Sequence, residues 1–159
     1  MGTAGNSDEG AARFDTPYEG AWVEGTHHFA LRVYFEDTDV AGIVYYANYL
    51  KFAERARTDM LRDLGVSHAE MMKRDGLVLV VRRCEIDYLR PAKLDDLLTV
   101  ETEAAKLGGA SVNLRQRVLR GDEVLADLKV LVVCIGPDGR PHRIPDYVRG
   151  VLPRMIQSE

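Results

Sequence analysis

The chain has 159 residues, of which 46% are hydrophobic and 29% are charged, and its formal net charge is −4. This length fits one domain with a real hydrophobic core, and no apolar stretch reaches the roughly eighteen residues that a membrane span requires. The balance of charges gives no broad basic field, which argues against general binding of nucleic acid. Cys84 and Cys134 each lie in an apolar, strand-like run. Such runs are typical of buried, reduced thiols, which favours a cytoplasmic protein.

Residues 1–27 are predicted to form a flexible tail, followed by a single domain over residues 28–157. The start of the chain is rich in Gly, Ala and acidic residues. It has neither the basic start nor the apolar segment of an export signal.

The first half of the predicted domain contains a strand, a loop and a long helix. Apolar residues alternate over 29–35, as expected for a half-buried strand, and turn-forming residues over 36–42 break this pattern. Apolar residues then recur every three or four positions over 46–64, which predicts a helix of about five turns with a buried stripe, ending at Gly65.

The second half of the domain reads as a short helix and four further strands. Ser67 and Glu70 have the spacing of a capping box, so a short helix is expected up to Gly76. Strands are predicted over 77–89, 97–105, 111–119 and 124–135, and the first of these is expected to be central because it opens with a continuous apolar run. Residues 144–155 are expected to form a short terminal helix. The fold class is therefore α+β, with a long helix wrapped by a five-stranded antiparallel sheet whose unpaired edge favours an oligomer.

The stretch that suggests chemistry is the loop before the long helix. It carries Asp37 and Asp39 ahead of Gly42, so a carboxylate lies close to the first backbone amides of a helix. These amides lack intrahelical partners and favour negative charge, so they are suited to a developing oxyanion, while a carboxylate can attack a carbonyl or activate a water. The sequence thus indicates an acyl-transfer site.

Two other interpretations of this loop are turn and capping chemistry, which stays open, and a calcium-binding loop, which lacks the required ligands. Asp-Thr-Asp before a helix is also ordinary turn and capping chemistry. A calcium loop fits at Asp37, Asp39 and Gly42, but its last position is Asn48 where a bidentate Glu is needed, and Ala41 replaces an oxygen ligand.

The remaining polar residues give weaker signals. The four histidines, His27, His28, His68 and His142, show no metal-ligand spacing and are expected to be surface or partly satisfied groups. The aromatic residues near the helix start fit either the core or an apolar acyl pocket: Tyr45, Tyr46, Tyr49 and Phe52. Several basic residues are candidates for contacts with phosphates of a nucleotide-bearing substrate: Arg82, Arg83, Arg90, Lys93, Lys106, Arg115 and Arg117.

Three motifs carry a resemblance to a known family. Residues 32–39 (RVYFEDTD), 42–49 (GIVYYANY) and 54–57 (ERAR), with 88–96 (YLRPAKLDD) later in the chain, closely resemble the YbgC branch of the 4-hydroxybenzoyl-CoA thioesterase family, which is associated with the Tol-Pal system. The similarity extends from about residue 29 to about residue 145.

The resemblance implies a hotdog fold, a homodimer or homotetramer with sites at subunit interfaces, and hydrolysis of acyl-CoA or acyl carrier protein thioesters. Asp39 takes the position of the catalytic carboxylate, as nucleophile or general base, and the backbone amide of Tyr46 is implied to polarise the thioester carbonyl. Asn48 is implied to orient the loop or a water. Many relatives have His where this chain has Tyr46, so only the backbone role carries over. The substrate-binding residues are expected to be Gly42, Val44, Tyr45 and Tyr49, with no metal or cofactor.

Two alternatives to a thioesterase remain. A hotdog hydratase needs a His paired with a carboxylate, and no His lies near the site in sequence. A scaffold protein linked to the cell envelope would bind a partner through the hotdog oligomer, with hydrolysis incidental.

Overall fold

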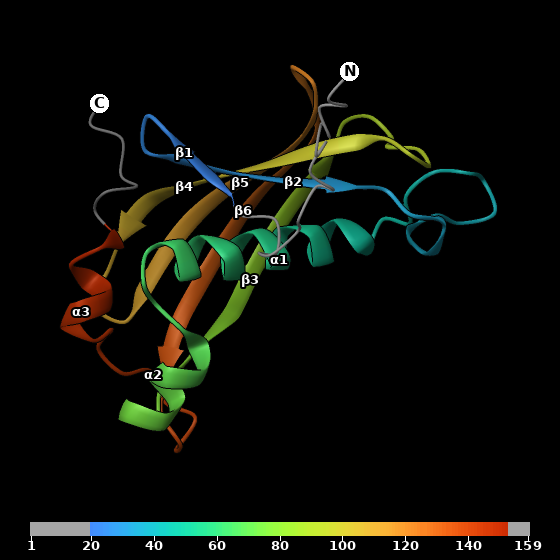
Figure 1. Cartoon of the computed structure of the whole chain (residues 1–159). Coiled ribbons are helices and arrows are strands. Elements are labelled where there is room, and N and C mark those ends of the chain that lie inside the picture. The colour runs from blue at the N-terminus through green and yellow to red at the C-terminus, as the bar shows by residue number, and fades with distance from the viewer. Residues whose placement is uncertain (1–19, 153–159) are drawn as a thin grey trace, which may run out of the picture.

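The computed structural model describes residues 20–152, which form one curved antiparallel sheet around a long helix (Figure 1). The strands are β1 (Ala21–Val23), β2 (Thr26–Arg32), β3 (Val78–Tyr88), β4 (Leu97–Leu107), β5 (Ser111–Arg120) and β6 (Glu123–Ile135). The helices are η1 (Phe35–Asp37), α1 (Asn48–Asp63), α2 (His68–Asp75) and α3 (Asp146–Arg149). The sheet order is β1-β2-β4-β5-β6-β3, and neighbouring strands are antiparallel.

Helix α1 forms because its apolar residues recur at helical spacing and face the concave side of the sheet. The residues that it buries include Phe52, Ala53, Ala56 and Met60. In the same core cluster lie Leu98 and Val100 of β4 and Leu114 of β5. The helix ends as predicted at Gly65, which adopts a positive φ of 82° that is easy for glycine. This is the hotdog arrangement that the sequence predicts, a sheet wrapped around one long helix.

The short helix α2 also follows its sequence signals. The Ser67 side chain accepts a hydrogen bond from the Glu70 amide at 3.3 Å, and Gly76 ends the helix in the left-handed conformation. None of the helices in the described part of the chain is long and apolar enough to cross a membrane.

The N-terminal part of the sheet differs from the prediction. Residues 20–27, expected in the tail, form β1 and the start of β2, so the sheet has six strands where five were expected. Glu24 and Gly25 connect them with φ values of 49° and 81°, as in the tight two-residue turns of β-hairpins. The expected tail over residues 1–19, and the end of the expected terminal helix beyond residue 152, lie outside the described residues.

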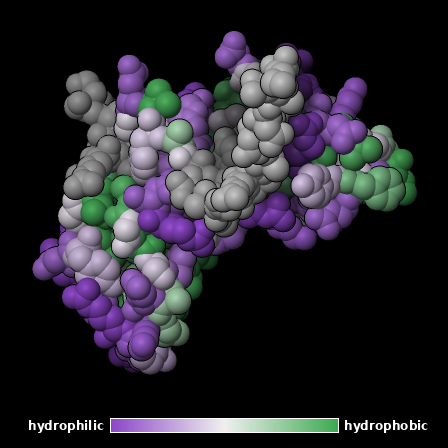
Figure 2. Space-filling view, in the orientation of Figure 1, coloured by the Kyte–Doolittle hydropathy of each residue, from purple (hydrophilic) through white to green (hydrophobic). Residues whose placement is uncertain are grey.

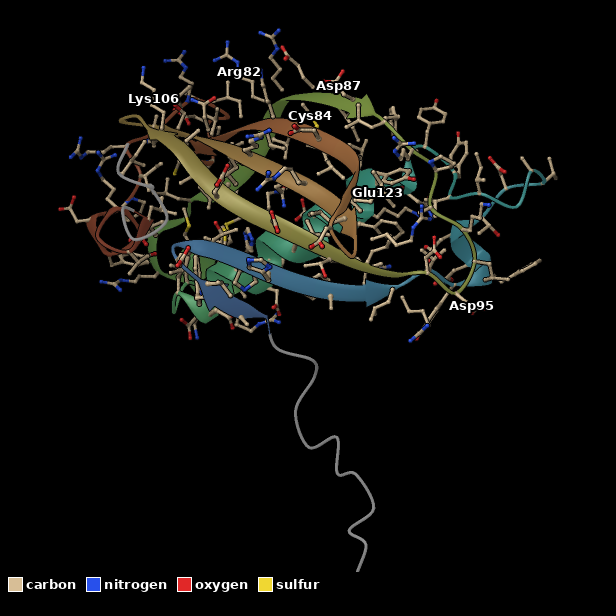
Figure 3. The ribbon with its side chains drawn as sticks, turned by 90° about the horizontal axis from the view of Figure 1, so that it is seen from above. Arg82, Cys84, Asp87, Asp95, Lys106 and Glu123 are labelled. Carbon is tan, nitrogen blue, oxygen red and sulfur yellow. The ribbon has the colours of Figure 1, made fainter. Side chains whose placement is uncertain are left out.

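The prediction that the strand over 77–89 is central is wrong, because β3 lies at the edge of the sheet and pairs only with β6. In Figure 3 the strand borders the sheet and carries the labelled Arg82, Cys84 and Asp87. In the single chain this apolar strand has a neighbouring strand on one side only. Its residues Val81 and Tyr88 are each 45% exposed.

Candidate active site

The loop between β2 and α1 is held in shape by the buried carboxylate of Asp37. One of its oxygens accepts a hydrogen bond from the Tyr34 amide at 2.8 Å, and the other accepts one from Nδ2 of Asn48 at 3.1 Å. Its backbone carbonyl accepts the Tyr45 amide at 2.9 Å. Asp37, which the sequence singled out only as part of a carboxylate pair, thus fixes the loop to the first residue of α1.

Asp39 lies at the turn of this loop and is exposed in the single chain. Its Oδ1 accepts the Ala41 amide at 2.9 Å, and its carbonyl accepts the Gly42 amide at 3.0 Å. Gly42 has a φ of 75°, which explains a glycine here. No hydrogen bond to Oδ2 of Asp39 is found among residues 20–152, so that oxygen is free to meet a substrate or a water.

The surface around this turn is unusually apolar for an exposed loop. Phe35 is 82% exposed and Val40 is fully exposed. Figure 2 shows hydrophobic side chains gathered at this end of the molecule.

The entrance to α1 leaves a backbone amide available. The Asn48 amide donates to the Tyr45 carbonyl at 2.8 Å, and the Leu50 amide donates to Ala47 at 3.1 Å. The Tyr46 amide has no acceptor in the described part of the chain. Tyr46 lies two residues before the helix, which starts at Asn48 and not at residue 46 as predicted. Its amide therefore lies just outside the helix, next to the N-cap Ala47, and is available because none of the described residues accepts from it.

A pocket opens beside this entrance, lined by Ile43, Val44, Tyr46, Tyr49 and residues 88–91. The Tyr49 side chain is buried and its oxygen accepts the Ala92 amide at 3.0 Å, while the Tyr88 hydroxyl donates to the Tyr46 carbonyl at 3.0 Å. Burial raises the pKa of both the Tyr49 and Tyr88 phenols, so they stay protonated at neutral pH. Both therefore act here as apolar walls with neutral hydroxyls.

The expected site residues are only partly brought together. Val44, Tyr46 and Tyr49 line the pocket, whereas Gly42 and Tyr45 lie outside its lining. Asp39 also lies outside it, and the Asn48 side chain is turned toward Asp37.

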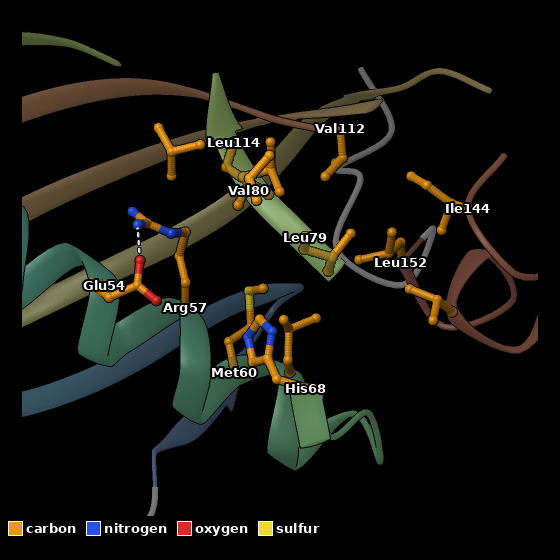
Figure 4. Close-up of a pocket in the computed structure, with 14 residues that line it drawn as sticks. Glu54, Arg57, Met60, His68, Leu79, Val80, Val112, Leu114, Ile144 and Leu152 are labelled. Carbon is orange, nitrogen blue, oxygen red and sulfur yellow. Dashed lines mark hydrogen bonds and ion pairs between the residues drawn. The ribbon is translucent and has the colours of Figure 1, made fainter. Parts of the chain in front are cut away.

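A second pocket, which the sequence did not reveal, lies farther along α1 (Figure 4). Its volume is about 580 Å³ including the open mouth, and its walls are mostly apolar side chains from α1, β3, β5, β6 and the segment 144–152. Glu54 and Arg57 form an ion pair on its α1 side. Only coordinates reveal this pocket, because its walls come from elements far apart in sequence.

Arg57 is held by a buried polar network. Its Nη1 donates to Oε1 of Gln116 at 2.9 Å, and Nε2 of Gln116 donates to the Ala53 carbonyl and to the Thr102 hydroxyl, each at 3.0 Å. Gln116 is fully buried in a strand, where a polar residue is unusual. In the sequence, the one sign of this network is a Gln at a position of the strand where the alternation expects an apolar residue.

The cysteines take no part in the candidate site. Cys134 is buried and Cys84 is half-buried, and both are free thiols. Burial raises the pKa of each thiol, which keeps them protonated and weak as nucleophiles. This agrees with their predicted packing role.

Comparison with known proteins gives one consistent family. Residues 41–126 match the family model described as "Thioesterase superfamily". The chain is 46% identical over 107 residues to "Acyl-CoA thioesterase YbgC" of Haemophilus influenzae, covering 67% of this chain and 79% of that protein. It is 41% identical over 120 residues to "Acyl-CoA thioester hydrolase YbgC" of Escherichia coli, covering 74% and 89%.

Solved structures agree with the sequence matches. The crystal structure of a probable thioesterase from Bartonella henselae superimposes with a TM-score of 0.72 at 41% identity, covering 76% of this chain and 99% of that one. A gentisyl-coenzyme A thioesterase superimposes with a TM-score of 0.72 at 26% identity, covering 79% and 98%.

Proposed function

The chain belongs to the thioesterase superfamily, in its YbgC-type branch, and from this premise we propose that it hydrolyses acyl-CoA thioesters to a free acid and CoA, with Asp39 as the essential residue. The observation that carries the proposal is the loop that holds both parts of the chemistry. It presents the free Oδ2 of Asp39 at its turn and the unpaired amide of Tyr46 at its end. An antiparallel β-bridge between Thr38 and Val44 closes the part of the loop that contains Asp39.

The chemistry follows from this pair. The Asp39 carboxylate either attacks the thioester carbonyl carbon, giving an anhydride that water then hydrolyses, or removes a proton from a water that attacks the same carbon. In both routes negative charge develops on the carbonyl oxygen, where the Tyr46 N–H donates a hydrogen bond, and the CoA thiolate leaves. The two routes use the same groups, and both stay open.

Asn48 acts in this proposal as a positioning residue. Its amide group donates to Asp37, which in turn fixes the loop. Asn48 therefore keeps Asp39 and the start of α1 in register without touching the substrate.

The exposure of Asp39 supports a site completed by a second copy of the chain. The edge strand β3 has no partner on its outer side, and it carries the exposed Val81 and Tyr88. Unpaired edges with apolar side chains favour association, so we propose a homodimer or homotetramer in which the β3 edges pair. Tyr88 also lines the pocket beside α1, so this pairing would bring a second chain next to the site and reduce its exposure.

The acyl group is proposed to lie in the apolar pocket formed by Val44, Tyr46 and Tyr49. Relatives at 30% identity or less are named for aromatic substrates, 1,4-dihydroxy-2-naphthoyl-CoA in one and gentisyl-CoA in another. Aromatic and aliphatic acyl-CoAs, and acyl carrier protein thioesters, are therefore all substrates to test. The proposed physiological substrate is an acyl-CoA of the cytoplasm.

The test compares thiol release from a panel of these thioesters by the wild type, Asp39→Asn and Glu36→Gln. An Asn at position 39 keeps an oxygen that can accept the Ala41 amide, so the loop should fold normally. We expect kcat to fall by at least about 1,000-fold in Asp39→Asn, because an amide can act neither as the nucleophile nor as the general base. Glu36→Gln removes an exposed charge from the same loop and should leave kcat nearly unchanged.

Full activity of the Asp39→Asn variant would overturn the mechanism. A hydrated acyl-CoA product in place of free thiol would favour the hydratase alternative. A wild-type protein inactive on the whole panel would favour the scaffold alternative.

A further inference from the structure

A cluster of one histidine and two carboxylates lies outside the candidate active site, where β2 packs against α1. His27 comes from β2 and is fully buried, whereas Asp59 and Asp63 come from successive turns of α1. Nε2 of His27 lies 2.7 Å from Oδ2 of Asp63 and 3.9 Å from Oδ2 of Asp59. All three ligand atoms lie within 4.8 Å of one another.

The side chains alone do not balance the charge of this cluster. Asp59 is only 8% exposed, and two carboxylates four residues apart on a helix repel each other. The nearest arginine is Arg62, whose Nη1 lies 3.8 Å from Oδ1 of Asp59 and whose side chain is 69% exposed. Two negative charges therefore face a single imidazole and a solvated guanidinium.

His27 does not resolve this imbalance at low cost. Its Nδ1 is buried with no hydrogen-bond partner among residues 20–152. Within that part of the chain, Nε2 makes the one hydrogen bond of the ring, with Oδ2 of Asp63, so the buried Asp59 has only the solvated Arg62 as a further cationic neighbour. The ring thus directs its only partnered nitrogen into the cluster.

We propose that His27, Asp59 and Asp63 bind a divalent transition-metal cation, for which zinc is the reference ion. Imidazole nitrogen and carboxylate oxygen are both common zinc ligands, and a charge of +2 balances the two aspartates. Ligand atoms about 2.0–2.1 Å from a tetrahedral zinc lie about 3.3 Å from one another. The two separations from Nε2, 2.7 Å and 3.9 Å, each differ from that distance by about 0.6 Å, and the two carboxylate oxygens lie within 4.8 Å of each other.

The backbone of Gly20 supports this site. Its amide donates to Oδ2 of Asp59 at 2.9 Å, the kind of outer contact that orients a ligating carboxylate. A Cβ at this position would lie 2.4 Å from Nε2 of His27, so only glycine allows the approach. The cation would join the N-terminal hairpin to the C-terminal half of α1, a structural role independent of Asp39.

The experiment titrates the chelator-treated full chain with zinc by calorimetry and with cobalt by visible absorption. We expect one ion per chain and the intense cobalt bands of a four-coordinate site, in which a water is the fourth ligand. His27→Gln and Asp63→Asn should each weaken binding by at least about 100-fold, since removing a ligand costs more than the 10- to 100-fold lost with a supporting group. Zinc should also raise the Tm of the wild type and not that of Asp63→Asn.

The matched control is His28→Gln. His28 is the next residue of β2, lies 4.0 Å from Glu101, and is 30% exposed, so its loss should leave zinc affinity unchanged. Asp63 is partly exposed, so Asp63→Asn decides the question if His27→Gln does not fold. Absence of binding to the wild type, equal affinity in folded Asp63→Asn, or a thiolate-to-cobalt band that places the ion at a cysteine would each overturn the proposal.

Discussion

The hydroxyl of Tyr49 shows how one side chain can hold the wall of the pocket. Its oxygen accepts the Ala92 amide at 3.0 Å, and the whole side chain is only 3% exposed. Tyr49→Phe would leave that buried amide without a partner, so we expect the free energy of unfolding to fall by about 1–3 kcal/mol. Urea unfolding measures the loss, and the exposed Tyr45→Phe is the control, with an expected change within about 0.5 kcal/mol. Equal stability of Tyr49→Phe and the wild type would contradict this role.

Asn48 gives a second prediction for a single residue. Asn48→Ala removes one of the two hydrogen bonds that the buried Asp37 carboxylate accepts within the described residues, so the loop should become less stable and less ordered. We expect kcat to fall about 10-fold with little change in KM, because the residue positions Asp39 and does not bind the substrate. A variant in which KM rises while kcat stays constant would instead place Asn48 in contact with the substrate.

Individual residues were predicted unevenly from the sequence. Val44 and Tyr49 were predicted from the resemblance to the family and line the pocket, whereas the role of Asp39 stays a prediction. The burial of Asp37 and the His27 cluster were missed, because both depend on which residues meet across elements distant in sequence. Spacing along a chain does not encode such contacts.

At the scale of elements, Arg120 joins β5 to the turn that precedes β4. Its Nη1 lies 2.7 Å from Oδ2 of Asp96, and the Lys93 amide donates to the same oxygen at 2.8 Å. A β-bridge between Ile43 and Lys93 joins this turn to the loop before α1. The ion pair therefore supports the loop that carries Asp39.

The same ion pair predicts a pH dependence. Burial opposes ionisation of Asp96, but the Lys93 amide and Arg120 together lower the pKa of this carboxyl. A lowered pKa in the folded state contributes stability above the ordinary carboxyl pKa of about 4, and this stability is lost as the pH falls through the lowered value. Arg120→Gln should thus destabilise the protein by about 1 kcal/mol at pH 7, after allowance for the partial exposure of both groups, and the difference should shrink toward pH 3. Urea unfolding at both pH values tests this, and a difference that grows in acid would refute it.

The elements themselves were predicted well where a local signal exists. The N-cap at Ser67, the helix end at Gly65 and the alternation of the later strands each depend on neighbouring residues, and each was confirmed. Strand β1 was missed because three residues in a Gly-rich region give no period. The predicted central position of β3 was wrong. An apolar run indicates that a strand is covered, but it does not say whether another strand of the same chain or another molecule covers it.

At the scale of the whole molecule, the position of β3 at the edge of the sheet leads to a prediction about assembly. If the β3 edges of two chains pair, a lysine on this edge would have to be buried without a partner, which is unfavourable. Val81→Lys should therefore convert the oligomer to a smaller species in light scattering. It should also reduce thioesterase activity although Asp39 is unchanged, because the proposed site needs the second chain.

The opposite edge of the sheet supplies the matched control for this change. Val23 lies on β1 and is 52% exposed, so Val23→Lys adds the same charge to the other edge strand. Both the oligomeric state and the activity of Val23→Lys should match the wild type. An active Val81→Lys monomer would show that one chain holds a complete site, and the exposure of Asp39 would then describe the working enzyme.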